Sequence, residues 1–295
     1  MFYFRSKEGV RLACLALLLA FINNAQSETP SAPPQSERAF LFTWPGQPEE
    51  ESLLVEHGPL VTDRPSFTDA SRPVGNPVTL VELGYTYSYN GDSSPYSSSH
   101  SYPEIALRQG FLANWFELRA SLNVSSSHLA DEDNTALGNL ELGNRLGITR
   151  QFGILPEFSI TPHVRLPTGT GDLRYHHYLP GVSLSYSWSV SDRFSLAGSS
   201  QVYQDETPDS HTRFTEWLQS AIGTWNATPT VALWGELAGF FRGSPAEERT
   251  SYYADVGVLY YVGKDSQFDI RLGSELEDNF GRNIFAGLGF SIRYY

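Results

Sequence analysis

Residues 116–124 read Phe-Glu-Leu-Arg-Ala-Ser-Leu-Asn-Val and alternate strictly between apolar and polar side chains. Since successive side chains of a β-strand point to opposite faces, this period of two predicts a strand with one apolar and one polar face. The same alternation recurs at 157–166, 182–188, 268–273 and 284–294. Because the pattern is repeated along the chain, the sequence predicts an all-β protein.

The alternating segments and the turn residues between them predict about twelve antiparallel strands. We expect these strands at residues 78–89, 103–110, 115–125, 137–150, 155–166, 177–188, 194–203, 214–226, 230–241, 252–262, 267–276 and 283–295. Their connections are alternately long and polar, then tight. Short turns at one rim and long loops at the other are typical of outer-membrane barrels. The prediction is a transmembrane up-and-down β-barrel at 77–295, with both of its termini at the periplasmic rim.

A secreted soluble β-sandwich or lipocalin-like barrel is the alternative fold. Such a protein would not need charged side chains in the middle of so many strands, whereas a membrane barrel can direct them into its lumen. Tyrosines also lie near the ends of the predicted strands, as in the aromatic girdles of membrane barrels. These tyrosines are Tyr85, Tyr87, Tyr89, Tyr252, Tyr260 and Tyr294. The membrane barrel is therefore favoured.

The first 27 residues are typical of a cleaved secretory signal peptide. A basic start (Arg5, Lys7 and Arg11) precedes a short apolar run at 12–22 and an Ala-Gln-Ser motif that ends at Ser27. The apolar run is well short of the ~20 residues that a spanning helix needs. Export together with a barrel fold predicts the outer membrane of a Gram-negative-type bacterial envelope.

Residues 28–76 are rich in proline, which blocks regular secondary structure. They are expected to form an extended periplasmic arm. Within the arm, Ala39–Trp44 and Leu53–Val55 are apolar enough to dock elsewhere on the protein. Residues 61–69 read Val-Thr-Asp-Arg-Pro-Ser-Phe-Thr-Asp and form the most distinctive motif of the arm.

We expect this motif to fold back into the periplasmic mouth as a plug or gate, because a solvated linker needs neither an aromatic residue nor an adjacent Asp-Arg pair. Arg64 would pair with a carboxylate of the barrel wall such as Glu82 or Glu104. Asp63 would pair with an arginine of the wall, and Phe67 would rest on the inner surface. A solvated linker is the alternative.

The polar faces of the predicted strands carry charges of both signs. They are candidates for a lumen lining that selects solutes by charge. The other interpretation is a ladder of arginines and carboxylates that fills and stiffens a narrow barrel, and the interleaved signs favour this ladder for most of them. The residues are Glu82, Glu104, Arg108, Glu117, Arg119, Glu141, Arg145, Glu157, His163, Arg165, Glu236, Asp255, Asp269, Arg271, Glu275 and Arg293.

No catalytic residue, cofactor or metal ion is expected from the sequence. Outer-membrane phospholipases place His and Ser two residues apart on one strand face, and no His of this chain has Ser at that spacing. His176 and His177 would point to opposite faces of a strand, and no carboxylate repeats their spacing, so a pair at a loop tip is favoured over metal ligands. The net charge of −13 argues against nucleic acid as a partner.

The motif at Val61–Asp69, followed by the strand at Leu80–Tyr87, resembles the outer-membrane family described as "Putative MetA-pathway of phenol degradation". Leu166–Gly169 and Gly287–Tyr294 are similar to later segments of that family. The resemblance covers about residues 60–295. It implies a transporter-like outer-membrane barrel linked to the uptake of aromatic or other hydrophobic compounds, and it implies no catalytic residues.

The sequence thus predicts a channel or transporter for small solutes, not an enzyme. A structural or surface-interaction barrel with a plugged lumen is the alternative. The expected partners are outer-membrane lipid, the barrel-assembly machinery and a small solute whose identity the sequence leaves open. Assembly machinery reads a terminal aromatic on the lipid face, so we expect this signal at Phe290, Ile292 and Tyr294, or at Tyr295 in a shifted register.

Overall fold

The computed structural model describes residues 40–46, 60–91, 97–129, 132–207, 210–243, 249–276 and 283–295. The predicted signal peptide at 1–27 and the apolar segment Leu53–Val55 lie outside these ranges. Within them lie thirteen strands and one 3-10 helix: β1 (Thr79–Asn90), β2 (Ser97–Phe111), β3 (Ala113–Leu129), β4 (Glu132–Leu137), β5 (Glu141–Thr149), β6 (Glu157–Arg165), η1 (Gly171–Leu173), β7 (Leu179–Ser189), β8 (Phe194–Glu206), β9 (Arg213–Thr228), β10 (Val231–Gly243), β11 (Arg249–Val262), β12 (Ser266–Glu275) and β13 (Asn283–Tyr294). In the same ranges, no helix has the length and apolar character needed to cross a membrane.

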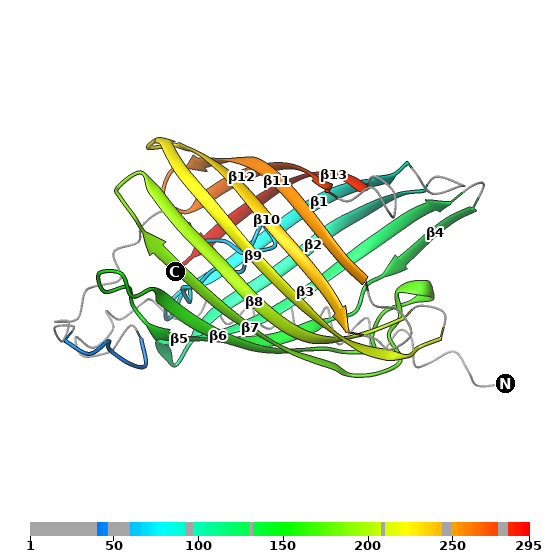
Figure 1. The fold of residues 1–295 in the computed structure, drawn as a ribbon, viewed down its shortest axis with the longest axis horizontal. Coiled ribbons are helices and arrows are strands. Elements are labelled where there is room, and N and C mark those ends of the chain that lie inside the picture. Colours follow the sequence, from blue (N-terminus) through cyan, green and yellow to red (C-terminus); the bar gives the residue numbers. More distant parts are fainter. Residues whose placement is uncertain are drawn as a thin grey trace.

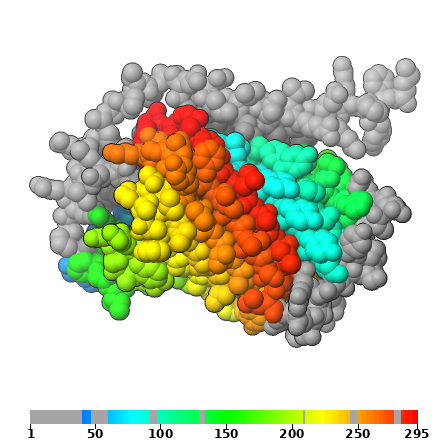
Figure 2. All heavy atoms as spheres, turned by 90° about the horizontal axis from the view of Figure 1, so that it is seen from above, coloured from blue at the N-terminus to red at the C-terminus, as the bar shows by residue number. Residues whose placement is uncertain are grey.

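All the strands belong to one antiparallel sheet that closes on itself, and Figure 1 shows them running obliquely side by side. The first strand, β1, pairs with the last, β13, and in Figure 2 β13 (red) lies between β12 (orange) and β1 (cyan). Strands β4 and β5 pair one after the other with β3, so together they occupy one place around the barrel. The predicted twelve-stranded antiparallel barrel is confirmed.

The predicted strand at 137–150 is wrong in one respect, because residues 138–140 interrupt it between β4 and β5. The loop between β6 and β7 supplies hydrogen-bond partners at the break. The amides of Leu137 and Leu140 donate to the hydroxyls of Thr170 and Thr168 at 2.9 and 2.8 Å. Since these backbone groups are satisfied by the loop, the segment does not need to continue the ladder with β3.

Strands β2 and β3 are longer than predicted. The prediction began the second strand at residue 103, whereas β2 begins at Ser97 and pairs there with the end of β3 up to Leu129. This part of β2 is a run of serines with no alternation. A hairpin that projects beyond the apolar belt has polar surroundings on both faces, so the period of two that reveals a strand is missing there.

The outer surface of the barrel carries a continuous apolar belt. Leu237, Ile270 and Leu288 are 62%, 63% and 57% exposed, which is extreme for aliphatic side chains in a water-soluble fold. Exposed aromatic side chains lie toward both rims. They are Phe111, Phe194, Trp225, Tyr260, Phe268 and Tyr294 near the short turns, and Tyr89, Tyr102, Trp217 and Tyr252 near the long loops. An apolar belt with two aromatic girdles is the surface of a barrel that spans a membrane.

The strands at 214–226 and 230–241 show the weakest alternation in the sequence, and the structure gives the reason. Trp217 points outward and is 42% exposed, whereas Trp234 points into the lumen and is 5% exposed. Leu218 and Phe240 also lie on the lumen side, in or against a buried cluster that includes Tyr203. Apolar residues occupy both faces of β9 and β10, because their outer face meets the membrane and their lumen face packs against Phe67.

Residues 40–46 dock beside the short-turn end of β5 and β6 (dark blue in Figure 1). The amides of Leu41 and Phe42 donate to the carbonyls of Gly147 and Ile148 at 3.0 and 2.8 Å. The Trp44 indole donates to the carbonyl of Pro156 at 3.1 Å. The predicted docking of the apolar stretch Ala39–Trp44 is thus present for the residues that the structure describes.

Candidate functional site: the occupied lumen

Residues 60–76 lie inside the barrel, toward its short-turn end, and we call them the plug. Carboxylates of the barrel wall accept hydrogen bonds from the backbone of the plug. The amides of Asp63 and Arg64 donate to Glu82 at 3.2 and 3.0 Å. Those of Phe67 and Thr68 donate to Glu236, both at 2.7 Å. The amide of Val74 donates to Glu117 at 2.8 Å. The plug has no regular secondary structure, so its amides would otherwise lack partners in the lumen. The wall carboxylates satisfy them.

Asp63 is the centre of an ionic cluster between the plug and the wall. Its carboxylate lies 2.8 Å from Arg119, 2.9 Å from Arg145 and 3.6 Å from Arg108. It also accepts a hydrogen bond from the amide of Ala70 at 2.8 Å. The predicted contact of Asp63 with a wall arginine is present, and three arginines make it instead of one.

Burial by itself would raise the pKa of Asp63, but Arg108, Arg119 and Arg145 outweigh burial and hold this pKa well below its ordinary value. A depressed pKa in the folded state means that the charge contributes stability above the pKa of the unfolded chain. That contribution is lost only as the pH falls through the lowered folded value. Mild acidification therefore leaves this contact intact.

Arg108 holds both ends of the plug. Its guanidinium donates to the carbonyl of Val61 at 3.0 Å and to the carbonyl of Arg72 at 3.1 Å. On the wall, the same guanidinium binds Glu117 at 2.8 Å and Glu82 at 3.3 Å. Since the Arg108 side chain is 1% exposed and those of Glu82 and Glu117 are fully buried, this is a network of buried charges in which each member has a partner.

Arg64 lies on a flat part of the wall where two glycines face each other across β1 and β13. Its guanidinium is bonded to Glu104, as predicted from the sequence, and lies 3.7 Å from Asp269. A Cβ atom on Gly84 would lie 2.0 Å from Arg64 Cζ, and one on Gly289 would lie 2.7 Å from Arg64 Nε. Only glycine at these two paired positions leaves room for the guanidinium.

Phe67 rests on an aromatic part of the inner wall. Its ring centroid lies 5.4 Å from that of Phe240 and 5.8 Å from those of both Tyr253 and Phe285. The guanidinium of Arg271 lies 5.9 Å from the centre of the Phe67 ring and donates to the carbonyl of Pro65 at 2.6 Å. The sequence motif at 61–69 thus supplies one ionic anchor at Asp63–Arg64 and one aromatic anchor at Phe67.

The side chains of Ser71 and Arg72 bind the opposite wall. The Ser71 hydroxyl lies 2.8 Å from Glu157 and 2.8 Å from the hydroxyl of Ser187, and Arg72 forms an ion pair with Glu157. The plug therefore crosses the lumen from β1 and β2 to β6 and β7. Glu157 is one of the predicted lumen residues, whereas Ser71, Arg72 and Ser187 lie outside the set that the sequence singled out.

The remaining predicted lumen residues are distributed along the wall. Arg165 bridges Glu141 at 3.2 Å and Asp205 at 3.4 Å nearer the long loops. Glu275 lies 3.6 Å from Arg249, and the His163 ring lies 3.3 Å from the carbonyl of Thr161. Asp255 lies opposite Glu236 on the neighbouring strand. Arg293 is in phase with the lumen but lies at the short-turn rim, where it binds Asp265 at 3.0 Å. Arg293 thus braces a turn and does not reach the centre of the lumen.

Cavities lie on both sides of the plug. On the long-loop side, one of about 530 Å³ is lined by Glu104, Asn123 and Tyr175 among others, and one of about 480 Å³ extends from Phe67 to Asn283. On the short-turn side, a cavity of about 280 Å³ lies between the plug and strands β7 to β11. The described plug residues lie between these spaces and obstruct the lumen.

The last two residues differ in their environment. Tyr294 ends β13, points outward and is 50% exposed. Tyr295 follows the strand, and its hydroxyl donates to Asp265 at 2.9 Å. Phe290, Ile292 and Tyr294 share the outer face, so Tyr294 continues the lipid-facing row, and the role of these residues in assembly stays a prediction.

The closed sheet, the apolar belt and the polar lumen define a transmembrane β-barrel of the outer-membrane class with a plug contributed by its own N-terminal segment. The model of the family described as "Putative MetA-pathway of phenol degradation" matches residues 62–294. The chain therefore belongs to this family. The match begins within the plug motif and so covers most of the plug together with the barrel strands.

Solved structures share the fold at low sequence identity. An outer membrane channel from Pseudomonas putida F1 is 16% identical, with a TM-score of 0.61 over 75% of this chain and 96% of that one. The NanC porin (9% identity, TM-score 0.47, 72% and 98% of the chains) and the KdgM porin (13%, 0.47, 72% and 99%) are more distant. No curated protein matches the sequence.

Proposed function

We propose that the protein is an outer-membrane channel for small solutes and that the plug is its gate. The observation that carries this proposal is the location of residues 60–76 in the lumen, between cavities that open toward either end. The short-turn rim, where the plug enters and β13 ends, would face the periplasm. A solute that enters from the long-loop side could then pass only after the plug has moved.

The contacts between the plug and the wall are of a kind that allows the plug to leave the lumen. The plug binds the wall mainly through ion pairs and hydrogen bonds, centred on Asp63, Arg64 and Arg72. Such contacts contribute little net stability relative to the same groups in water, because the cost of desolvation offsets the attraction between the charges. Water that enters the lumen can replace them. A permanently filled barrel would gain more from an apolar interior.

The cavity of about 480 Å³ that ends at Phe67 supports small aromatic molecules as the solute class, and we call it the vestibule. Phe67, Phe240, Tyr253 and Phe285 lie at its inner end, with Arg271 beside them. An apolar cavity of about 150 Å³ suffices to hold benzene, so the vestibule has ample room for a substituted ring. Aromatic rings packed edge to face provide a favourable surface for another ring.

Uptake by proteoliposomes tests the proposal. Radiolabelled benzoate and cyclohexanecarboxylate carry the same charge and differ in the aromatic ring, so we expect faster uptake of benzoate. Phe240→Ala should abolish this preference, because Phe240 lines the vestibule. The matched control is Phe241→Ala, which removes the neighbouring ring from the outer face, where it stacks on Trp217 at 4.8 Å, and should keep the preference.

The same assay addresses the alternative function. The many ion pairs between plug and wall also fit a structural barrel whose lumen stays closed. No uptake of either compound above protein-free liposomes, by a protein that has inserted correctly, would overturn the channel proposal and favour the structural role. Equal uptake of the two compounds would retain the channel and overturn the assignment of aromatic solutes.

A further inference from the structure

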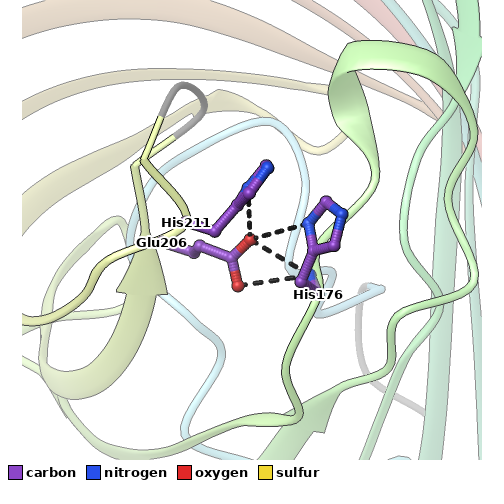
Figure 3. Close-up of side chains that lie close together, drawn as sticks. All are labelled: His176, Glu206 and His211. Atoms are coloured by element: carbon purple, nitrogen blue, oxygen red, sulfur yellow. Dashed lines mark hydrogen bonds and ion pairs between the residues drawn. The ribbon is translucent and has the colours of Figure 1, made fainter.

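Three histidines surround one carboxylate at the long-loop rim, away from the plug. His176 and His177 lie in the loop between β6 and β7, while Glu206 and His211 belong to the hairpin of β8 and β9. Figure 3 shows the side chains of His176, Glu206 and His211 converging. The ligand atoms of His176, Glu206 and His211 all lie within 4.8 Å of one another. The sequence favoured a loop pair over metal ligands for His176 and His177, since no carboxylate repeats their spacing. Glu206 and His211 come from the next hairpin, so spacing within the loop did not reveal them.

The distances in this cluster match the spacing of ligands around a metal ion. The Nδ1 atoms of His176 and His211 lie 3.2 and 3.1 Å from Glu206 Oε1, and Nδ1 of His177 lies 2.7 Å from Glu206 Oε2. Ligands bound at about 2.0–2.1 Å around a tetrahedral zinc ion are roughly 3.3 Å apart, because the edge of a tetrahedron is about 1.6 times its centre-to-corner distance. The Nδ1 atoms of His176 and His211 are already close to that spacing from Glu206 Oε1.

The carboxylate at the centre is held in place before any ion binds. The Glu206 side chain is 2% exposed, whereas the three imidazoles are 42–47% exposed and can be reached from solvent. The amide of His176 donates to both oxygens of Glu206, at 3.1 and 3.2 Å. His211 has a φ of +53°, a conformation that non-glycine residues seldom adopt unless the surroundings require it. That backbone conformation accompanies the approach of its ring to within 3.7 Å of the ring of His176.

We propose that His176, His211 and Glu206 bind a divalent transition-metal ion of the zinc type, while His177 is hydrogen-bonded to the same carboxylate. Imidazole nitrogens favour zinc, copper and nickel, whereas calcium and magnesium prefer sites made entirely of oxygen ligands. Two neutral imidazoles and one carboxylate give the site a charge of −1, which a divalent cation more than balances. The ion would take the place of the hydrogen bonds between Nδ1 of these imidazoles and the carboxylate, with each imidazole proton held on Nε2 and any further proton released to solvent.

Such an ion would tie the β6–β7 loop to the β8–β9 hairpin at the outer mouth. Tyr175 precedes His176 and lines the cavity of about 530 Å³. Arg165, which lines the same cavity, lies 3.4 Å from Asp205, the residue before Glu206. The metal would therefore fix two segments that border the entrance to the lumen. This site is independent of the plug and of the proposed aromatic solute.

Calorimetry on the processed full-length protein, purified without a histidine tag, tests the site. Titration with ZnCl₂ is expected to show one ion bound per chain, and CaCl₂ and MgCl₂ should not compete. Glu206→Gln and His211→Ala should each weaken binding about tenfold or more. His128→Ala removes a histidine from β3 and is the matched control, which should bind zinc like the wild type.

A second measurement on the unmodified protein keeps the test independent of variant folding. With one equivalent of Cu²⁺, electron paramagnetic resonance should show hyperfine coupling to at least two imidazole nitrogens. The proposal would be overturned by a wild-type protein that binds no zinc. It would equally be overturned by binding that survives unchanged in correctly inserted Glu206→Gln and His211→Ala variants, or by a copper spectrum without nitrogen coupling.

Discussion

Asp63→Ala is expected to release the plug and to convert the barrel into a conducting pore. The substitution would leave Arg108, Arg119 and Arg145 clustered around an empty position, because the Asp63 carboxylate lies 2.8–3.6 Å from each of them. Removing one partner of a buried ion pair costs about 3–5 kcal/mol, since the remaining charges stay desolvated. Expulsion of the plug lets water reach the arginines and relieves this cost. Single-channel recording in planar bilayers would measure the change.

Asp69→Ala is the matched control for this experiment. Asp69 is also a plug aspartate near the same arginines, but it lies 3.5 Å from Arg119 and 4.0 Å from Arg145. Its removal leaves Asp63 to balance the cluster, so the conductance should remain close to that of the wild type. If Asp63→Ala inserts normally and conducts no better than Asp69→Ala, the ionic cluster does not hold the plug in place.

Leu237→Arg is expected to destabilise the barrel by ~2–4 kcal/mol, the cost of an arginine near the middle of the membrane. Leu237 lies in the middle of β10, is 62% exposed on the outer surface and follows Glu236, which faces the lumen and binds the plug. The free energy of unfolding, measured by urea titration in lipid vesicles, would show the loss.

The matched control for this change is Ile284→Arg. Ile284 is also on the outer surface, 43% exposed, but it lies at the long-loop end of β13, where an arginine reaches the membrane interface. The expected cost there is about 0–1 kcal/mol. Equal costs at the two positions would show that the outer belt does not face lipid as described.

The fold could be predicted from the sequence because each strand of a membrane barrel has lipid on one face and the polar lumen on the other. Segments such as 116–124 and 268–273 place apolar side chains toward lipid and polar ones toward the lumen, so their period of two is strong. The strand boundaries were predicted wrongly where a segment does not have lipid on one face and the lumen on the other. The serine run at the start of β2 has no apolar face, and the break at 138–140 depends on bonds from a loop about thirty residues further on.

The plug site could be predicted in part. The Asp63-Arg64 pair and Phe67 indicated a segment that binds the inner wall of the barrel. The wall charges at Glu104 and Arg145 could be recognised as polar positions within alternating strands. The sequence could not reveal which wall residue meets which plug residue, because these contacts join residues far apart in the chain. Gly84 and Gly289 carried a usable signal, since they are glycines on the lumen face of two strands.

The central claim is that the plug occupies the lumen in the membrane and must move for a solute to pass. The variant Ser71→Cys/Ser187→Cys tests it most directly, because these two hydroxyl oxygens lie 2.8 Å apart and join the plug to β7. The only native cysteine, Cys14, lies in the predicted signal peptide. We expect the disulfide to form in the oxidising cell envelope and to block benzoate uptake by reconstituted protein. Reduction of the disulfide should restore uptake. Undiminished uptake by the oxidised protein would contradict the account, as would failure of the two cysteines to pair in a correctly assembled barrel.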